Sequence, residues 1–266
     1  MIGVIGGSGF YELLSDVEHH DVDTPYGRPS GPVSIGQVAG RPVAFLARHG
    51  AGHVLPPHRI PYRANLWALD QLGVDRVVAP CAVGSLKDAI RPGDFVVCDQ
   101  FVDRTSGRPD TFFDGPHVHH VSTADPYCPE LRQAVAGALA EHSRRVHHTG
   151  TVVVVQGPRF STRAESAWYR AAGWDVINMT QYPEATLARE MGMCYSAVAL
   201  VTDHDTGVDG SDLVEPVSMD EVLAVLAEMV DTVKGVLSSA IAHLPEVPTC
   251  DCRRHRGPVD PPQPTD

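Results

Sequence analysis

The sequence lacks a long apolar run and lacks an excess of basic residues. No apolar stretch approaches the roughly 20 residues that span a bilayer. The chain carries 21 Lys and Arg against 33 Asp and Glu, a formal net charge of −12 with His neutral. A field of this sign repels nucleic-acid phosphates and anionic lipids. We therefore expect neither a membrane nor a nucleic acid as a partner.

Cysteines are few, and no basic, cleavable leader precedes the strand-like segment MIGVIGG. Six cysteines occur in 266 residues, and Cys81, Cys98, Cys128 and Cys194 lie in apolar or strand-like segments. Disulfide frameworks are typical of small secreted domains. We therefore interpret the cysteines as reduced thiols and expect a cytoplasmic protein.

Apolar residues, glycine and proline are plentiful. The apolar fraction of 43% allows a full-sized core, and 24 Gly and 22 Pro punctuate the chain at short intervals. Short β-rich apolar runs alternate with helical patterns, which predicts a single α/β domain whose strands are covered on both faces. The predicted strands are 2–5, 43–46, 76–79, 95–98, 151–155, 176–177 and 196–201, and the predicted helices are 62–72, 129–142, 162–172, 183–191 and 219–244.

Local signals indicate two helix starts and one hairpin. Thr162 and Ser218 are each followed three residues later by Glu, which fits the reciprocal capping box. Segments 33–36 and 43–46, joined by a turn containing Ala-Gly, predict an antiparallel hairpin added to an otherwise parallel set of strands.

The composition changes after Leu244. The segment EVPTCDCRRHRGPVDPPQPTD is rich in proline and charge and has no apolar periodicity. We therefore divide the chain into a domain of residues 1–244 and a tail of residues 245–266, and expect the tail to lie on the surface or to be disordered.

Potential anion-binding groups follow two predicted strands, at the edge of the sheet where ligands of α/β folds usually bind. The first strand runs into Gly6-Gly7-Ser8-Gly9, whose backbone N–H groups and hydroxyl can cradle an anion, although a bare turn also uses glycines. Arg48 supplies a forked, permanent charge and His49 a titratable donor. A surface pair at a loop is the alternative interpretation of these two residues.

Two carboxylates follow the strand at 196–201. Asp203 and Asp205 face the same side if the backbone stays extended, and each then raises the proton affinity of the other, which suits a general acid. An Asp-rich turn is the alternative. Segments 80–85 and 178–180 also leave predicted strands, so several strand ends bring polar groups to one edge.

The segment after the Val-rich strand contains a Gly-Pro turn followed by Phe160 and Ser161. An aromatic ring held at such a turn can stack on a flat heterocycle. Phe160 equally suits the hydrophobic core.

Several segments together resemble the methylthioadenosine phosphorylase branch of the purine nucleoside phosphorylases. The resemblance runs from about Ile2 to near Leu244 and implies a three-layer phosphorylase-type α/β fold, with a mixed central sheet or barrel flanked by helices in a single domain. It also implies a homotrimer, in some cases a hexamer, with inorganic phosphate as co-substrate and no metal or organic cofactor. The segments are GVIGGSGFY, FLARHG, PHRIPYRAN, DQFVDRT, GPRFSTRAE, INMT followed by YPEATLARE, and TDHD.

The resemblance also implies roles for individual residues. Met179 matches the position next to the ribose, and Asp203 and Asp205 match the acids on the purine side. Ser161 and Met219 match positions that influence substrate choice. The positions that match phosphate-binding residues are Ser8, Arg48, His49, Ala82 and Thr180, with Cys81 beside them. His120 resembles a residue that reaches the 5′-substituent pocket of a neighbouring subunit.

The sequence departs from the family pattern near these positions. Cys81 stands where a hydroxyl residue is common, and a thiol is a weaker hydrogen-bond donor. Gln156 replaces a frequent Glu, and His204 replaces a frequent Tyr. A carboxyl group at Asp203 favours adenine, whereas a 6-oxopurine, including 5′-methylthioinosine, needs a different donor pattern. Cleavage of 6-oxopurine nucleosides is therefore the alternative activity.

A metal-binding protein is the alternative from another functional class. Cys250, Cys252 and His255 offer three zinc ligands if a fourth comes from elsewhere, and His117, His119 and His120 form a second group. A disulfide between Cys250 and Cys252 is a further possibility, although it is strained.

Overall fold

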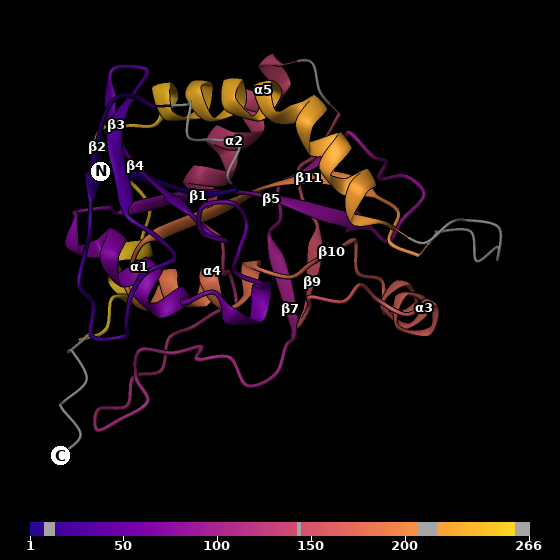
Figure 1. The fold of residues 1–266 in the computed structure, drawn as a ribbon, viewed down its shortest axis with the longest axis horizontal. Helices are drawn as coiled ribbons and strands as arrows, with labels where there is room; N and C mark the ends of the chain where they lie inside the picture. The colour runs from indigo at the N-terminus through magenta and orange to yellow at the C-terminus, as the bar shows by residue number, and fades with distance from the viewer. Residues whose placement is uncertain (8–13, 143–144, 207–216, 259–266) are drawn as a thin grey trace.

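The structure, a computed structural model, describes residues 1–7, 14–142, 145–206 and 217–258, with only the backbone of Met219 (Figure 1). Its strands are β1 (Ile2–Gly6), β2 (Ser15–His20), β3 (Val33–Val38), β4 (Arg41–Ala47), β5 (Arg76–Ser85), β6 (Phe95–Val96), β7 (Gln100–Arg104), β8 (Val146–His147), β9 (Thr151–Val155), β10 (Val176–Asn178) and β11 (Cys194–Asp203). Its helices are α1 (Tyr62–Gln71), α2 (Pro129–Glu141), α3 (Arg163–Ala171), α4 (Gln181–Glu190) and α5 (Met219–His243), with short 3₁₀ turns η2 (Pro57–Arg59) and η3 (Cys252–His255).

The strands form one mixed sheet in the order β2-β3-β4-β1-β5-β10-β9-β7, and β11 pairs along the other side of β5. β5 is parallel to β1 and β11 but antiparallel to β10. It changes neighbour along its length, because it pairs with β1 as far as Val78 and with β10 only from Gly84. Within the described parts of the chain, residues 79–83 of β5 therefore have no strand on that side, and a gap opens in the sheet.

Helices cover both faces of the sheet (Figure 1). Alternate residues of a strand point to opposite faces, so Phe45 packs in the cluster with α2 and α5, whereas Leu46 packs in the cluster with α1 and α4. α3 packs Tyr169 against β9 and β10 in a third, smaller cluster. This double burial explains why the strands have continuous apolar sequences.

The predicted fold class, a three-layer α/β arrangement with a mixed central sheet, is confirmed. Both capping boxes are present, at Thr162 and at Ser218. The predicted hairpin is also confirmed as β3 and β4, which run antiparallel around Ala39 and Gly40, both with positive φ. In the described ranges, no helix combines the length and apolar character needed to cross a membrane.

Three details of the predicted elements were wrong. The set is not otherwise parallel, because β2, β6 and β10 each run antiparallel to a neighbour. The strand predicted at 76–79 continues to Ser85, because β11 pairs along its whole length. The strand predicted at 95–98 ends at Val96.

The described part of the C-terminal segment packs against the domain. Arg76 donates hydrogen bonds to the carbonyl oxygens of Pro245 and Glu246, at 2.6 and 2.9 Å. Arg256 forms a bidentate ion pair with Asp70, at 2.7 and 2.9 Å. Cys252 in η3 is buried. The division into residues 1–244 and 245–266 stays a prediction.

Candidate active site

The gap in the sheet opens into a cavity of about 1090 Å³. β1 and β4 end at this level, at Gly6 and Ala47, while β5 and β11 continue beyond them. Side chains that follow the ends of β4, β10 and β11 therefore meet around the unpaired segment of β5. One side of α5 closes the cavity with Val222, Leu226 and other apolar residues.

Arg48 lies at the base of this cavity in a buried ion pair with Glu184 of α4. The exposed fractions are 3% for Arg48 and 1% for Glu184. Nε and Nη2 of Arg48 each donate to one carboxylate oxygen of Glu184 at 2.8 Å. Burial opposes the charge of Arg48, but the Glu184 carboxylate outweighs burial and raises the pKa of Arg48 above its usual value.

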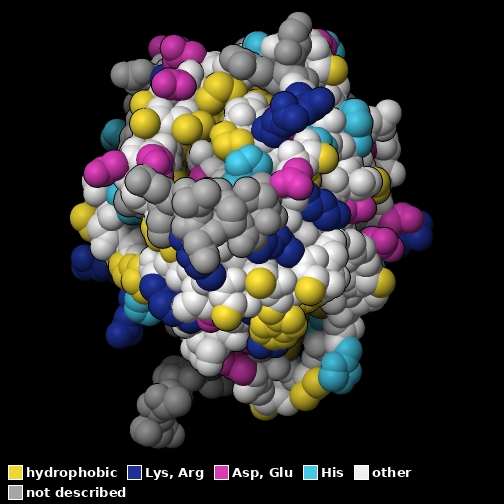
Figure 2. All heavy atoms as spheres, turned by 90° about the vertical axis from the view of Figure 1, so that its right-hand side faces the viewer, with side chains coloured by type: hydrophobic (Ala, Val, Ile, Leu, Met, Phe, Trp, Pro, Cys, Tyr) yellow, Lys and Arg dark blue, Asp and Glu magenta, His cyan; other side chains and the backbone are white. Residues whose placement is uncertain are grey.

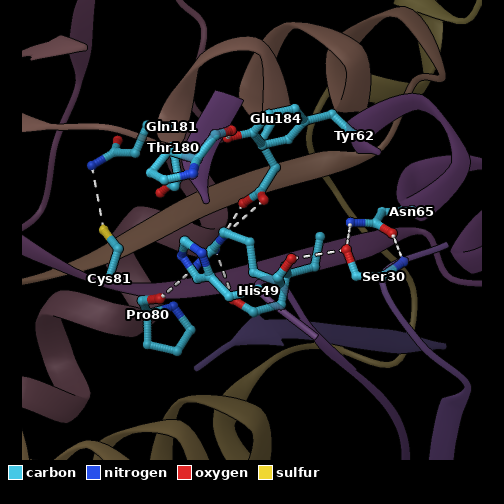
Figure 3. A network of polar contacts seen from close by, with 12 residues as sticks. Ser30, His49, Tyr62, Asn65, Pro80, Cys81, Thr180, Gln181 and Glu184 are labelled. Carbon is cyan, nitrogen blue, oxygen red and sulfur yellow. Dashed lines mark hydrogen bonds and ion pairs between the residues drawn. The ribbon is translucent and has the colours of Figure 1, made fainter. Parts of the chain in front are cut away.

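The remaining donors of Arg48 bind the ends of two strands. Nη2 donates to the carbonyl oxygen of Ile5 at 2.8 Å, and Nη1 donates to that of Pro80 at 3.1 Å. Pro80 belongs to the β5 segment without a neighbouring strand on that side. The guanidinium therefore supplies the hydrogen-bond donor that a neighbouring strand would give to the Pro80 carbonyl oxygen. A guanidinium has five N–H groups, so one Nη1 hydrogen has no partner among the described residues. Glu184 and Pro80 are labelled in Figure 3, where dashed lines mark these hydrogen bonds.

A second set of hydrogen bonds holds the backbone at Arg48. The Ser30 hydroxyl donates to the carbonyl oxygen of Arg48 at 2.8 Å, and Asn65 of α1 donates to Ser30 Oγ at 2.9 Å (Figure 3). Because both ends of Arg48 are fixed, the residue is held in one position before any ligand binds.

His49 is held as a neutral imidazole. Its Nδ1 donates to the carbonyl oxygen of Leu55 at 2.8 Å, and its ring stacks on that of His53. Burial lowers the pKa of His49 to about 4. At neutral pH, Nε2 is therefore an acceptor, suited to a protonated oxyanion such as hydrogen phosphate.

Thr180 is the N-cap of α4, beside the same β5 segment. Asn178 bridges the two, because its Nδ2 donates to the carbonyl oxygen of Ala82 at 2.9 Å and its Oδ1 accepts from the Thr180 backbone N–H at 2.7 Å. Burial raises the pKa of Cys81 to about 11, so this thiol stays protonated at neutral pH. Gln181 Nε2 donates to Cys81 Sγ at 3.5 Å (Figure 3).

Two carboxyl groups that follow β11 also line the cavity. Asp203 ends β11 and accepts hydrogen bonds from the Thr202 hydroxyl and the Asp205 backbone N–H, both at 2.7 Å. Burial raises the pKa of Asp203. Burial, assisted by the charge of Asp203, raises the pKa of Asp205 to about 6. The pair can therefore hold a proton close to neutral pH.

The expected extended backbone through Asp205 was wrong. Asp205 has φ 53°, so the chain turns after β11. Asp205 Oδ2 and Ser161 Oγ are buried in the cavity wall without a well-formed hydrogen bond among the described residues. The Ser161 and Ser166 hydroxyls nevertheless lie close enough to Asp205 to lower its pKa in part. Buried polar atoms in a cavity that lack a partner are potential ligand contacts.

Gly84 makes room for Asp203. The two residues are partners across β5 and β11, next to an irregularity in the register. A Cβ atom at Gly84 would lie 2.8 Å from Asp203 Oδ1 and 2.9 Å from Ile177 Cγ2. Glycine is therefore needed here for the carboxyl group to reach its observed place.

The structure brings most of the predicted site residues into this one cavity. Ser8 lies outside the described residues, as does the side chain of Met219. His120 is exposed and does not line the cavity of its own chain, so its role toward a neighbouring subunit stays a prediction. The predicted residues that line the cavity are Arg48, His49, Cys81, Ala82, Phe160, Ser161, Met179, Thr180, Asp203 and Asp205.

Sequence reasoning missed Glu184, Asn178 and Gly84 as residues that position the site. Glu184 lies in the quoted segment YPEATLARE, where an acid beside a proline at a helix start gave no reason to pair it with Arg48. Cys81 and Ala82 were predicted to follow a strand end, but they lie within β5. They line the cavity because β5 changes its neighbour from β1 to β10 along this stretch.

Potential metal ligands gather elsewhere. Among the described residues, the side chains whose ligand atoms come close enough to share a metal are Cys128, Cys194, Cys250 and Cys252, outside the cavity. The sequence-based set of Cys250, Cys252 and His255 was wrong in one member, because His255 is not part of this group and Cys128 and Cys194 are.

Comparison with known proteins places these features in a family. Residues 1–242 match the family model described as the phosphorylase superfamily. The chain is 54% identical to a purine nucleoside phosphorylase of Streptomyces coelicolor, covering 98% of this chain and 95% of the relative. It is 53% identical to an S-methyl-5′-thioadenosine phosphorylase of Mycobacterium tuberculosis, covering 97% and 95%.

Solved structures agree with the sequence relatives. The fold is similar to that of methylthioadenosine phosphorylase from Schistosoma mansoni in complex with adenine, with a TM-score of 0.86 and 39% identity over 91% of this chain and 90% of that one. Since the match extends over nearly the whole domain, the chain belongs to the phosphorylase superfamily.

Proposed function

We propose that the protein is a pentosyltransferase that cleaves 5′-methylthioadenosine with inorganic phosphate, releasing adenine and 5-methylthioribose 1-phosphate. The observation that carries the proposal is the pairing, across one cavity, of an oxyanion site at Arg48 and His49 with two carboxyl groups of raised pKa. Relatives named S-methyl-5′-thioadenosine phosphorylase, at about half identity, support the substrate.

Phosphate acts on the sugar side of the reaction. Breaking the C1′–N9 bond leaves positive charge on the ribose, which a phosphate anion beneath C1′ stabilises before one of its oxygens forms the new bond to C1′. The remaining Nη1 hydrogen of Arg48, the Thr180 hydroxyl and the His49 ring are the groups that hold this anion. Ser8, Ala82 and Cys81 complete the proposed set of phosphate-site positions.

The carboxyl pair acts on the base side. The electron pair of the C1′–N9 bond moves into the purine, and a proton shared with N7 makes the base a better leaving group. Asp203 is the proposed proton donor, and Asp205 the acceptor for the 6-amino group. Since the catalysis uses only these side chains and the co-substrate, the proposed reaction needs no cofactor.

The apolar side of the cavity suits the rest of the substrate. Met179 packs beside Gly157 at the ribose position, and Phe160 and Ser161 border the cavity near the acids. Val222 and Leu226 of α5 extend this apolar wall, which favours a methylthio group over the hydroxyl of an ordinary nucleoside. Met219, at the first position of α5, and His120 of a neighbouring subunit are the further proposed specificity residues.

Cleavage of 6-oxopurine nucleosides is the second candidate, because the relative from Streptomyces coelicolor is named purine nucleoside phosphorylase. One incubation series separates the two candidates. Methylthioadenosine, methylthioinosine, adenosine and inosine are each incubated with and without phosphate, and the released bases and sugars are identified by chromatography. Adenine release only with phosphate supports the proposal, whereas faster release of hypoxanthine supports the alternative.

We also propose that the protein is a cytoplasmic homotrimer, with a hexamer as the larger alternative. Trp168 of α3 and Leu223 of α5 are each about half exposed. Figure 2 shows hydrophobic side chains gathered in the upper part of the face that carries α3 and the start of α5. Exposed apolar patches often mark subunit interfaces. Light scattering of the purified protein distinguishes a monomer, a trimer and a hexamer.

A further inference from the structure

Four cysteines that are far apart in the sequence converge at one point. The sulfur atoms of Cys128, Cys194, Cys250 and Cys252 all lie within 4.8 Å of one another. The Sγ of Cys250 is 3.6 Å from that of Cys128 and 3.3 Å from that of Cys194. The arrangement joins two positions of the domain to two positions of the C-terminal segment.

Each cysteine is placed by a separate structural element. Cys128 is the N-cap of α2, and its backbone N–H donates to the carbonyl oxygen of Tyr195 at 2.8 Å. Cys194 is the first residue of β11, and Cys252 begins η3. The exposed fractions of Cys128, Cys194 and Cys252 are 1%, 2% and 4%, and all three belong to the core cluster beneath α2 and α5.

We propose that these four cysteines form a structural site for one zinc ion. Four sulfurs at the corners of a tetrahedron with Zn–S bonds of about 2.3 Å are about 3.8 Å apart, close to the spacing observed here. A soft tetrathiolate set selects zinc over the hard cations magnesium and calcium. The site departs from the sequence-based expectation of a protein without a metal.

The geometry also differs from that of disulfide pairs. A disulfide divides four cysteines into two bonded pairs at about 2.05 Å, whereas Cys250 here approaches two different partners.

The role of the site is to fasten the C-terminal segment. Around the cluster, Thr249 donates its backbone N–H to Glu130 of α2 at 2.8 Å. Farther along, the Gly257 N–H donates to the carbonyl oxygen of Glu190 at 3.0 Å. Arg76 and Asp70 fasten the two ends of the segment through Pro245, Glu246 and Arg256. A metal held by ligands from both sides would join the middle of the segment to the domain.

The site lies far from the proposed chemistry. Cys194 and Asp203 are at opposite ends of β11, and a ten-residue strand is about 30 Å long. With four protein ligands, zinc has no open position for a substrate. The proposal is therefore independent of the proposed function, and its failure leaves that function untouched.

The first test measures metal and thiols on the full-length wild-type protein, produced without a polyhistidine tag in zinc-supplemented medium. Mass spectrometry of the elements is expected to give about one zinc per chain. Titration of the unfolded protein with a thiol reagent and a chelator, without reductant, is expected to give all six thiols. Six thiols without metal, two thiols as from two disulfides, or iron in place of zinc would each overturn the proposal.

The second test compares two variants. Cys250→Ser with Cys252→Ser removes two ligands from the C-terminal segment, and Cys98→Ser changes a buried thiol outside the cluster. The double variant is expected to lose zinc, to be cleaved by protease within the segment 245–258 at least about tenfold faster, and to keep the wild-type kcat. Cys98→Ser is expected to retain zinc. Equal zinc in both variants would overturn the ligand assignment.

Cobalt(II) gives a readout that does not depend on variant folding. After chelation of zinc, added cobalt(II) is expected to restore protease resistance and to produce the intense sulfur-to-metal absorption of a tetrathiolate site. Weak absorption, typical of oxygen and nitrogen ligands, would contradict the site.

Discussion

The two ends of β11 use buried polar groups in opposite ways. At the amino end, Cys194 joins a cluster of four thiols, and the neighbouring Arg76 donates hydrogen bonds to two backbone carbonyls of the C-terminal segment. At the carboxyl end, burial raises the pKa values of Asp203 and Asp205, and Asp205 Oδ2 has no well-formed hydrogen bond among the described residues. The amino end therefore stabilises the fold, whereas the carboxyl end holds carboxyl groups whose hydrogen bonding a bound ligand would complete.

This difference predicts which substitutions lower activity and which lower stability. Changes at the carboxyl end are expected to lower activity, and changes at the amino end are expected to lower stability with little effect on turnover. Strain and incomplete pairing are typical of functional sites, because the surrounding structure has to hold them in place.

The largest effect is expected for Asp203→Asn, which keeps the shape of the side chain but removes the ionisable group. If Asp203 shares a proton with the leaving base, kcat should fall by about 10²- to 10⁴-fold. Steady-state kinetics with methylthioadenosine, beside circular dichroism to confirm folding, measures this effect. An unchanged kcat would show that Asp203 is not the proton donor.

Glu184→Gln tests a group that serves both activity and stability. It leaves the buried charge of Arg48 without its counter-charge, and breaking a buried ion pair in this way costs about 3–5 kcal/mol. Denaturant unfolding should show this loss. A variant as stable as the wild type would mean that the ion pair does not hold Arg48 in position.

Gly84→Ala tests whether the position of Asp203 matters as well as its charge. The added methyl group would meet Asp203 Oδ1 at 2.8 Å and displace it, so kcat should fall roughly 10- to 100-fold. Gly137→Ala is the matched control, because this helical glycine has nothing within 4 Å of the added atom. Equal activity of both variants would contradict the requirement for close approach.

Arg76→Met tests the amino end in isolation. It removes the donors to the Pro245 and Glu246 carbonyls and should lower the free energy of unfolding by about 2–3 kcal/mol. The kcat measured at 25 °C should remain within about twofold, since the site lies at the other end of the strand. A large loss of kcat at full folding would break the contrast between the two ends.

Asp205→Asn gives the smallest expected change in stability and tests its pH dependence. The folded-state pKa of about 6 exceeds the ordinary value of 3.8, so the carboxyl group favours folding at low pH, and this stabilisation is lost as pH rises from about 4 to 6. The variant should therefore be more stable than the wild type by roughly 1–2 kcal/mol at pH 8, with no advantage near pH 4. Unfolding curves at both pH values measure the difference, and a constant gap would contradict the raised pKa.

Much of the fold could be predicted because local pattern and burial agree. The core strands are apolar throughout since both faces are covered, and the capping boxes at Thr162 and Ser218 mark two helix starts. β2 was missed because it is exposed over most of its length and has no apolar pattern. β7 was missed as well, because none of its residues is fully buried and its last two are exposed.

The site could be predicted in its residues but not in its geometry. The family resemblance identified Arg48, His49 and the two acids, whereas the partner of Arg48 lies 136 residues away. The change of neighbour along β5 is likewise a long-range feature without a local signal. The spacing of Cys250 and Cys252 gave a local signal for half of the cysteine cluster, but Cys128 and Cys194 join it only through the fold.

Crystals soaked in phosphate, or in sulfate as its stand-in, test most directly whether the carboxyl end of the sheet holds an oxyanion. Tetrahedral density is predicted within about 3 Å of Arg48 Nη1, the Thr180 hydroxyl and His49 Nε2, with Arg48 still paired to Glu184. An empty cavity at phosphate concentrations that saturate cleavage of methylthioadenosine would contradict this mechanism.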